Sequence, residues 1–216
     1  MLTFEKVSDA LLKLGYSHGG FLCDITSRTP LPQTPIIAPA TTVQFATKSN
    51  TTFRPSPTCT VPPAGAHFAD LIAPGHTVVI TQEKYTSNAL AGGLVVARMR
   101  KLGAPLVVVD GRVRDVPELK LPVYARGTST VGAGAGSKVV GVGGEVVVAG
   151  GEEGEGVSVS EGDWVFADEQ GVVVFPRGEL EGVVELVRGI ALADQKVMRD
   201  VLRGGELAEA FREHRR

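Results

Sequence analysis

Apolar side chains recur along the chain with two different spacings, and each spacing predicts a different kind of element. Phe4, Val7 and Leu11 lie three or four positions apart, which predicts an amphipathic helix over residues 3–14. The same spacing continues over residues 179–203 and predicts a long helix near the C-terminal end. Short apolar runs predict strands at residues 41–46, 76–82, 106–110 and 122–125.

The clearest unit lies in the middle of the chain. An apolar strand at residues 76–82 is followed by a helical pattern at residues 88–102 and by a second apolar strand at residues 106–110. Asn88 is the predicted N-cap, and Gly103 follows the predicted helix end. Two strands joined by a helix through short connections run parallel, so we predict an α/β fold with a βαβ unit over residues 76–110.

The second half of the chain is rich in glycine. The chain has 27 glycines in 216 residues, and eleven of them fall in residues 127–156. This distribution favours a turn-rich β segment. We predict one hairpin from residues 138–142 and 145–149 through Gly143-Gly144, and a second hairpin from residues 163–167 and 172–175.

Charge and cysteine content exclude several classes of protein. With 22 basic and 24 acidic residues the net charge is −2, and no basic cluster of the kind that binds nucleic acid occurs within the chain. No apolar run reaches the ~18 residues that a membrane span needs. Two cysteines and an N-terminal segment without a targeting pattern favour free thiols and a cytoplasmic protein. We expect one domain over residues 1–216, with no nucleic-acid or membrane partner.

The βαβ unit predicts where a ligand would bind. Its helix runs antiparallel to both strands, so the helix start and the end of the second strand meet at one edge of the sheet. Gly92 and Gly93 lie in the helix opening, and Arg114 and Asp115 follow the strand. A helix N-terminus binds anions, arginine binds a carboxylate or keto oxygen, and aspartate is a ligand for Mg²⁺ or Mn²⁺. Two structural explanations stay open: the glycines allow close packing, and Arg114-Asp115 is a solvated turn pair.

Several segments resemble one family when they are taken in order. Residues 88–95, 107–115, 162–168 and 171–176 are similar to the RraA-like / 4-hydroxy-4-methyl-2-oxoglutarate aldolase family, and so are residues 7–11 near the start. The resemblance extends over roughly residues 4–200. It implies a swivelling-domain-like β/β/α layered fold and a homotrimer or hexamer with sites near subunit interfaces.

The resemblance also implies an activity and a set of site residues. The family's aldolases are divalent-metal-dependent lyases that cleave a 4-hydroxy-2-oxo diacid to pyruvate, and they decarboxylate oxaloacetate. By position, Arg114 would contact the keto or enolate oxygen of a small 2-oxo acid, and Asp115 would bind Mg²⁺ or Mn²⁺. Backbone amides at the helix start would hold the substrate carboxylate, namely those of Gly92, Gly93, Leu94 and Val95.

One position departs from the family pattern. The aldolases usually carry Asp or Glu where this chain has Gly93, and that acid supports the water shell of the metal. Its loss keeps a second function in view, because the family also includes regulators that inhibit a ribonuclease by protein contacts. The sequence therefore predicts a metal-dependent lyase, with a non-catalytic binding protein on the same scaffold as the alternative.

Overall fold

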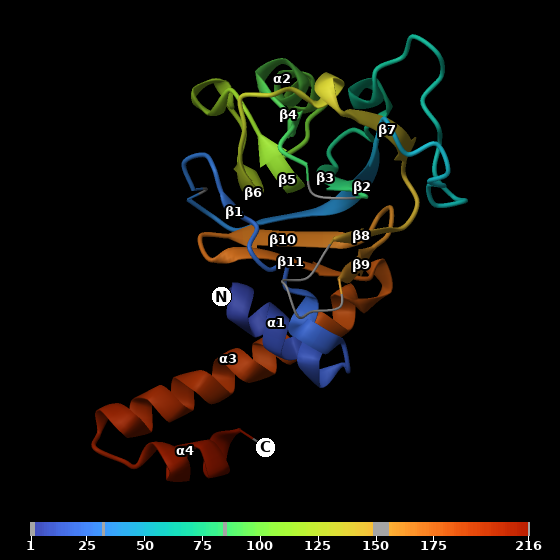
Figure 1. Ribbon diagram of the computed structural model, residues 1–216. Helices are drawn as coiled ribbons and strands as arrows, with labels where there is room; N and C mark the ends of the chain where they lie inside the picture. The colour runs from blue at the N-terminus through green and yellow to red at the C-terminus, as the bar shows by residue number, and fades with distance from the viewer. Residues whose placement is uncertain (1–2, 32, 84–85, 149–155, 216) are drawn as a thin grey trace.

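The computed structural model describes residues 3–31, 33–83, 86–148 and 156–215 (Figure 1). Its helices are α1 (Phe4–Lys13), α2 (Gly93–Lys101), α3 (Leu180–Leu202) and α4 (Leu207–His214). Its strands are β1 (Thr26–Ser27), β2 (Ile36–Thr47), β3 (Thr77–Gln82), β4 (Ala89–Ala91), β5 (Val107–Val113), β6 (Val123–Thr128), β7 (Ser137–Val142), β8 (Val146–Val148), β9 (Val157–Val159), β10 (Trp164–Asp168) and β11 (Gly171–Phe175). Within the described residues, nine strands form one mixed sheet in the order β1-β6-β5-β3-β2-β10-β11, with β4 on β5 and β7 on β2.

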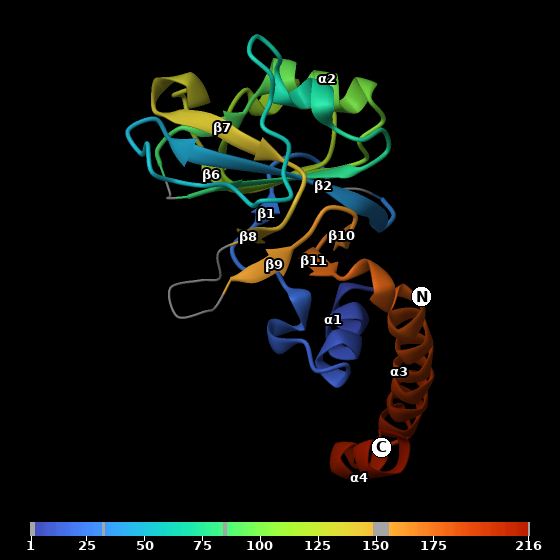
Figure 2. The same cartoon turned by 90° about the vertical axis from the view of Figure 1, so that its right-hand side faces the viewer.

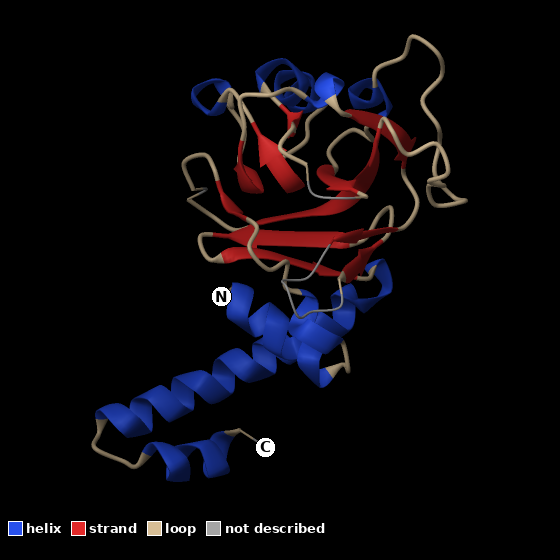
Figure 3. Cartoon of the chain, viewed as in Figure 1, coloured by secondary structure: helices blue, strands red, loops and turns tan. Residues whose placement is uncertain are grey.

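The sheet curls so that two β layers lie face to face, with helices outside them (Figures 1 and 3). Val107 and Val109 of β5 belong to the apolar cluster beneath α2, whereas Val108 belongs to the cluster between the layers. This division follows from the alternation of side chains along a strand. α1 and α3 pack on the outer face of β10 and β11. The predicted α/β layered fold with a long C-terminal helix is confirmed.

The predicted βαβ unit is also present. β3 and β5 are parallel neighbours, with Val78 opposite Val107 and Ile80 opposite Val109. All four residues are fully buried, as expected for parallel strands that are covered on both faces. The unit therefore brings the start of α2 and the end of β5 to one edge of the sheet.

The helix of this unit begins at Gly93, so the predicted start at Asn88 is wrong. Residues 89–91 instead form β4, which pairs with the end of β5, and β5 itself continues past the predicted residue 110 to Val113. Alanine and leucine favour helix, but here all three β4 residues are buried and their backbone pairs with β5, so tertiary pairing overrides local propensity. Gly92 is the N-cap.

β2 is longer than the predicted strand because it belongs to both layers. Its first residues pair antiparallel with β10, and its later residues pair parallel with β3. Pro39 lies where the partner changes. The N–H of the next residue, Ala40, points toward β10 and donates to the carbonyl of Asp163 at 2.8 Å. The nitrogen of Pro39 therefore points to the other side of β2, where β3 lies. β3 pairs with β2 only from Ala40 onward. The proline therefore removes no ladder hydrogen bond.

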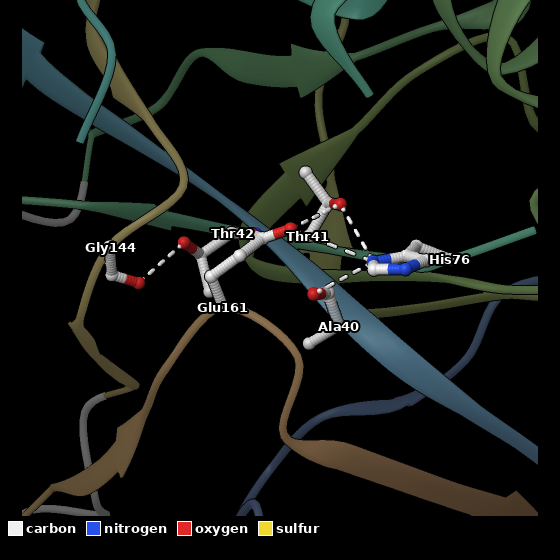
Figure 4. A network of polar contacts seen from close by, with 6 residues as sticks. All are labelled: Ala40, Thr41, Thr42, His76, Gly144 and Glu161. Carbon is white, nitrogen blue, oxygen red and sulfur yellow. Dashed lines mark hydrogen bonds and ion pairs between the residues drawn. The ribbon is translucent and has the colours of Figure 1, made fainter. Parts of the chain in front are cut away.

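A polar network holds this change of partner in place (Figure 4). Glu161 accepts the N–H of Thr42 at 3.0 Å and the hydroxyl proton of Thr41 at 2.9 Å. Nδ1 of His76 lies 3.1 Å from both the Thr41 hydroxyl oxygen and the Ala40 carbonyl oxygen. Because Thr41 gives its only proton to Glu161, Nδ1 must carry a proton and donate it. The network joins β2, the start of β3 and the turn before β10.

One predicted hairpin is confirmed and the other is wrong. β10 and β11 pair from Trp164–Phe175 to Asp168–Gly171. The other predicted hairpin would join β7 to β8, but β7 pairs with β2 and β8 pairs with β9. Residue 149 of that prediction lies outside the described residues. Gly143 and Gly144 both have positive φ, at 77° and 78°, and they turn the chain away from the β2–β7 layer.

The C-terminal helices form an arm that projects from the body (Figures 1 and 2). α3 agrees with the predicted helix, whereas α4 was not predicted. α4 folds back on α3, where Nε2 of His214 lies 2.6 Å from Oδ2 of Asp200. The arm exposes several large apolar side chains: Leu192, Met198, Leu202 and Leu207. Neither α3 nor any other helix in the described part of the chain is long and apolar enough to cross a bilayer.

Candidate functional site

A backbone hydrogen bond joins the two segments that carry the predicted site residues. The N–H of Arg114 donates to the carbonyl of Ala91 at 3.1 Å, which extends the β4–β5 ladder beyond Val113. The chain after Ala91 then turns into α2 at the point where the chain after β5 turns away. The structure thereby places Gly92 and Gly93 beside Arg114 and Asp115.

Gly92 allows the two segments to approach closely. A Cβ atom at this position would lie 2.7 Å from Oδ2 of Asp115 and 3.0 Å from Cγ of Arg114. Both distances are shorter than van der Waals contact, so a larger residue would displace the Asp115 carboxylate or the Arg114 side chain. One structural explanation that the sequence left open, glycine for close packing, therefore applies to Gly92.

Asp115 caps the start of α2. Its Oδ2 atom accepts the N–H of Gly93 at 3.1 Å and lies 3.5 Å from Nε of Arg114. Its backbone is left-handed, with φ 57°, a conformation that Asp and Asn adopt more readily than other non-glycine residues. The side chain is 38% exposed, so the carboxylate is accessible to a ligand. Asp115 therefore fixes the geometry of the site whether or not it binds a metal.

The first turn of α2 offers the remaining anion-binding groups. The first intrahelical bond runs from the N–H of Val96 to the carbonyl of Gly92, so the N–H groups of Leu94 and Val95 precede it. The Val95 side chain packs against the core, whereas the Leu94 side chain is 89% exposed. Of the four amides that the sequence predicts for a substrate carboxylate, the N–H of Gly93 is engaged by Asp115, whereas Leu94 and Val95 lie next in the helix opening.

Glu118 is a further candidate site residue, which the sequence did not predict. Its Oε2 atom lies 2.7 Å from the position that a Cβ atom on Gly93 would occupy. The short 3₁₀ turn Val116–Glu118 brings it there, with the N–H of Glu118 donating to the carbonyl of Asp115 at 2.8 Å. A carboxylate therefore stands in the space above Gly93, supplied by a residue shortly after Asp115. The Asp-Val-Pro-Glu run was the available signal, because proline favours a turn that returns the chain.

Glu118 lines a cavity of about 320 Å³ together with Arg100 and Lys120. Asp115 lines a different, open cavity of about 750 Å³. Arg112, Arg114 and Asp115 line it on the β5 side. Side chains with hydroxyl groups line much of the rest: Ser87, Thr128, Ser129 and Thr130. The Arg114 guanidinium lies across the chain at Gly132, where an added Cβ would be 2.7 Å from Nη1. Charged and hydroxyl groups suit a small polar anion.

The donor set at the site fits a hard divalent cation. Asp115 and Glu118 both lie against Gly93, and Mg²⁺ is commonly held by one or two carboxylates together with water. In the described part of the chain, three potential metal ligands come together in only one place, at Asp200, Glu213 and His214. That cluster lies on the arm, away from α2 (Figure 1).

Comparison with known proteins shows the family of the chain. Residues 5–174 match the RraA-like family, described as Aldolase/RraA. A protein of Halalkalibacterium halodurans, named as a proposed 4-hydroxy-4-methyl-2-oxoglutarate aldolase, is 32% identical over 116 residues. That alignment covers 52% of this chain and 52% of the relative, so the chain matches about half of the relative's length.

Solved structures show the same fold. A protein of Pseudomonas syringae pv. tomato superposes with a TM-score of 0.75 at 22% identity, covering 97% of this chain and 92% of the other. Streptomyces coelicolor RraAS2, described as an unusual member of the RNase ES inhibitor RraA protein family, superposes with a TM-score of 0.72 at 23% identity. That superposition covers 94% of this chain and 93% of RraAS2. At these identities the likeness concerns the fold.

The capping role of Asp115 can be separated from its charge by two substitutions. Asp115→Ala removes the acceptor for the Gly93 N–H and places alanine in a left-handed conformation, so we expect a loss of about 1–2 kcal/mol in the free energy of unfolding. Asp115→Asn keeps an acceptor oxygen and tolerates the backbone, so we expect a loss under about 0.5 kcal/mol. Urea unfolding at pH 7 measures both. Equal stability of the two variants would contradict the capping role.

Proposed function

This chain belongs to the RraA-like family, and we propose that it is a divalent-metal-dependent lyase acting on small 2-oxo acids at the site around Arg114 and Asp115. The reaction is the cleavage of a 4-hydroxy-2-oxo diacid to pyruvate, or the decarboxylation of oxaloacetate. The family contains aldolases as well as RraA regulators, and the relative from Halalkalibacterium halodurans carries an aldolase name.

The observation that carries the proposal is that Asp115 and Glu118 both lie against the start of α2, at Gly92 and Gly93, with Arg114 beside Asp115. Two carboxylates at this point offer hard oxygen ligands for Mg²⁺ or Mn²⁺. The helix start and the arginine next to them offer donors for an anionic substrate. Glu118 also fills the position where this chain lacks the acid expected at Gly93.

Different residues of the chain contact different parts of the substrate. The amides of Leu94 and Val95, at the positive end of the α2 dipole, bind the C1 carboxylate. Arg114 donates to the C2 oxygen, where negative charge develops when the C3–C4 bond breaks and pyruvate leaves as its enolate. Asp115 would hold the divalent cation, which would supply Lewis-acid stabilisation of the developing negative charge. The hydrogen bond from the Gly93 N–H to Asp115 holds the Asp115 carboxylate next to the amides at the start of α2.

A homotrimer or hexamer is the assembly we propose, because RraA-like proteins are oligomeric. Leu94, at the edge of the site, and the apolar side chains of the arm are surfaces that a second copy would cover. Such contacts would place the site near a subunit interface.

A binding protein on the same scaffold is the second candidate. It is favoured by Gly93, which has no acidic side chain, and by the exposed Leu94, which suits a protein contact. RraAS2, which shares this fold, is described as a member of a ribonuclease-inhibitor family. In this case Asp115 and Glu118 would serve only the local structure, and turnover would be absent.

The lyase proposal predicts metal-dependent pyruvate release. The full chain with Mg²⁺ or Mn²⁺ should produce pyruvate above the rate with the metal alone, followed by coupling to lactate dehydrogenase. Asp115→Asn, which keeps the cap, should lower kcat/KM by about 10²- to 10³-fold. Asp70→Asn is the matched control, because Asp70 is an exposed aspartate that pairs with Arg98 on another surface. Equal rates for the wild type and Asp115→Asn would refute the proposal and leave the binding protein.

Glu118 has a test of its own. If it takes the place of an acid at position 93, Glu118→Gln should weaken both Mn²⁺ binding, measured by electron paramagnetic resonance titration, and activity by about 10-fold or more. Gly93→Asp should raise both in a Glu118→Ala background, where the space is free. On its own, Gly93→Asp brings its side chain against Glu118 and should raise neither.

Glu181→Gln on α3 is the control for loss of a carboxylate at the start of a helix. The role of Glu118 is wrong if Glu118→Gln binds Mn²⁺ like the wild type. It is also wrong if Gly93→Asp restores nothing in the Glu118→Ala background.

A further inference from the structure

Arg112 lines the same cavity as Arg114 and Asp115, although the proposed reaction has given it no role. The two arginines lie two positions apart along the end of β5, a separation of about 6.6 Å along a strand. A second cavity of about 360 Å³ adjoins the first, because both are lined by Ser87 and Arg112. Arg112 therefore stands at the point where the candidate site extends beyond the groups that would hold a 2-oxo acid.

The structure fixes the Arg112 guanidinium. Its Nη1 donates to the carbonyl of Thr128 on β6 at 3.0 Å. The position opposite Arg112 on β6 is Gly127, and a Cβ there would lie 2.9 Å from Nη1, so the glycine makes room for the arginine. One donor is used to orient the group, and the remaining N–H donors of the planar fork are left for a ligand.

Charge balance distinguishes Arg112 from its neighbours. Arg126 pairs with the buried Asp110 at 2.5 Å and lies 3.6 Å from Asp24. Arg114 lies 3.5 Å from Asp115. Arg112 also lines the cavity. Within the described ranges, no carboxylate lies within 4.0 Å of its guanidinium. Among the described residues that line the cavity, two arginines, Arg112 and Arg114, face one carboxylate, Asp115, so the lining carries an excess of positive charge.

We propose that Arg112 binds the second carboxylate of a 2-oxo diacid and selects diacids over monoacids at this site. This inference rests on the proposed function for the placement of the 2-oxo acid group. Arg112 lines the same cavity as Arg114 and Asp115, so a 2-oxo acid group held at Arg114 leaves the part of the cavity at Arg112 for the far end of the substrate. An arginine fork recognises a carboxylate through two parallel hydrogen bonds.

The proposal also predicts that pairing with Arg112 affects the two reactions differently. In retro-aldol cleavage of a 4-hydroxy-2-oxo diacid, the C3–C4 bond breaks, the C4 hydroxyl loses its proton and becomes a carbonyl, and C3 gains a proton. The second carboxylate keeps its charge throughout, so its pairing with Arg112 persists in the transition state. In oxaloacetate decarboxylation, the second carboxylate leaves as CO₂ and loses its charge. Pairing with Arg112 would stabilise that reactant more than the transition state.

Binding without turnover tests the selectivity. 2-Oxoglutarate and 2-oxopentanoate differ by one carboxylate, and neither has the 4-hydroxyl group needed for cleavage. With Mg²⁺ present, isothermal titration of the full chain should show about 10- to 100-fold tighter binding of 2-oxoglutarate. Arg112→Gln should abolish that difference, and Arg112→Lys should keep part of it. Arg98→Gln, on the outer face of α2, is the matched control and should bind like the wild type.

Kinetics provide the second measurement. Arg112→Gln should raise KM for a 4-hydroxy-2-oxo diacid by about 10-fold or more, with kcat for oxaloacetate decarboxylation unchanged or higher. A structural fault alone would lower both reactions together.

The outcomes separate the two proposals. The Arg112 inference is overturned if the wild type binds both acids equally or binds neither, or if Arg112→Gln keeps the preference. Selective binding by a wild type that releases no pyruvate would refute the lyase proposal and support the role of Arg112.

Discussion

The hydrogen bond from the Gly93 N–H to Oδ2 of Asp115 is the constraint on which the candidate site depends. It connects the start of α2 to the residue at which the chain leaves β5. The connection requires glycine at position 92, where a side chain would collide with Asp115, and a left-handed backbone at Asp115. The same carboxylate therefore fixes the local fold and offers the metal ligand, so its two roles can be separated only by a substitution that keeps the acceptor oxygen.

Much of this arrangement could be predicted from the sequence, because it depends on local signals. The valine-rich strands, the intervening helix and the glycines predicted that the start of α2 would meet Arg114 and Asp115 at one edge of the sheet, where the structure places them. The start of α2 could not be predicted, because the Ala-Leu-Ala segment of β4 satisfies its backbone by pairing with β5, a contact distant in sequence. Glu118 was missed for a related reason: its approach to Gly93 depends on how a short turn packs against the helix.

The layered fold supports the site from behind. β2 pairs with β10 in one layer and with β3 in the other, and Glu161 accepts the N–H of Thr42 where the partner changes. β2 therefore ties β3 and β5 to the second layer. Three arginines lie near the ends of β5 and β6, but they are not equivalent. Arg126 is paired with the buried Asp110 and Arg114 lies beside Asp115, whereas Arg112 faces the cavity with its charge available. This distribution favours a substrate with more than one negative group.

A crystal structure of the protein soaked with Mn²⁺ and pyruvate tests the central claim most directly. The account predicts anomalous density about 2.1 Å from a carboxylate oxygen of Asp115. It also predicts the pyruvate carboxylate at the Leu94 and Val95 amides and the keto oxygen at Arg114. Mn²⁺ density only at the Asp200–His214 cluster on the arm, with none beside Asp115, would contradict it.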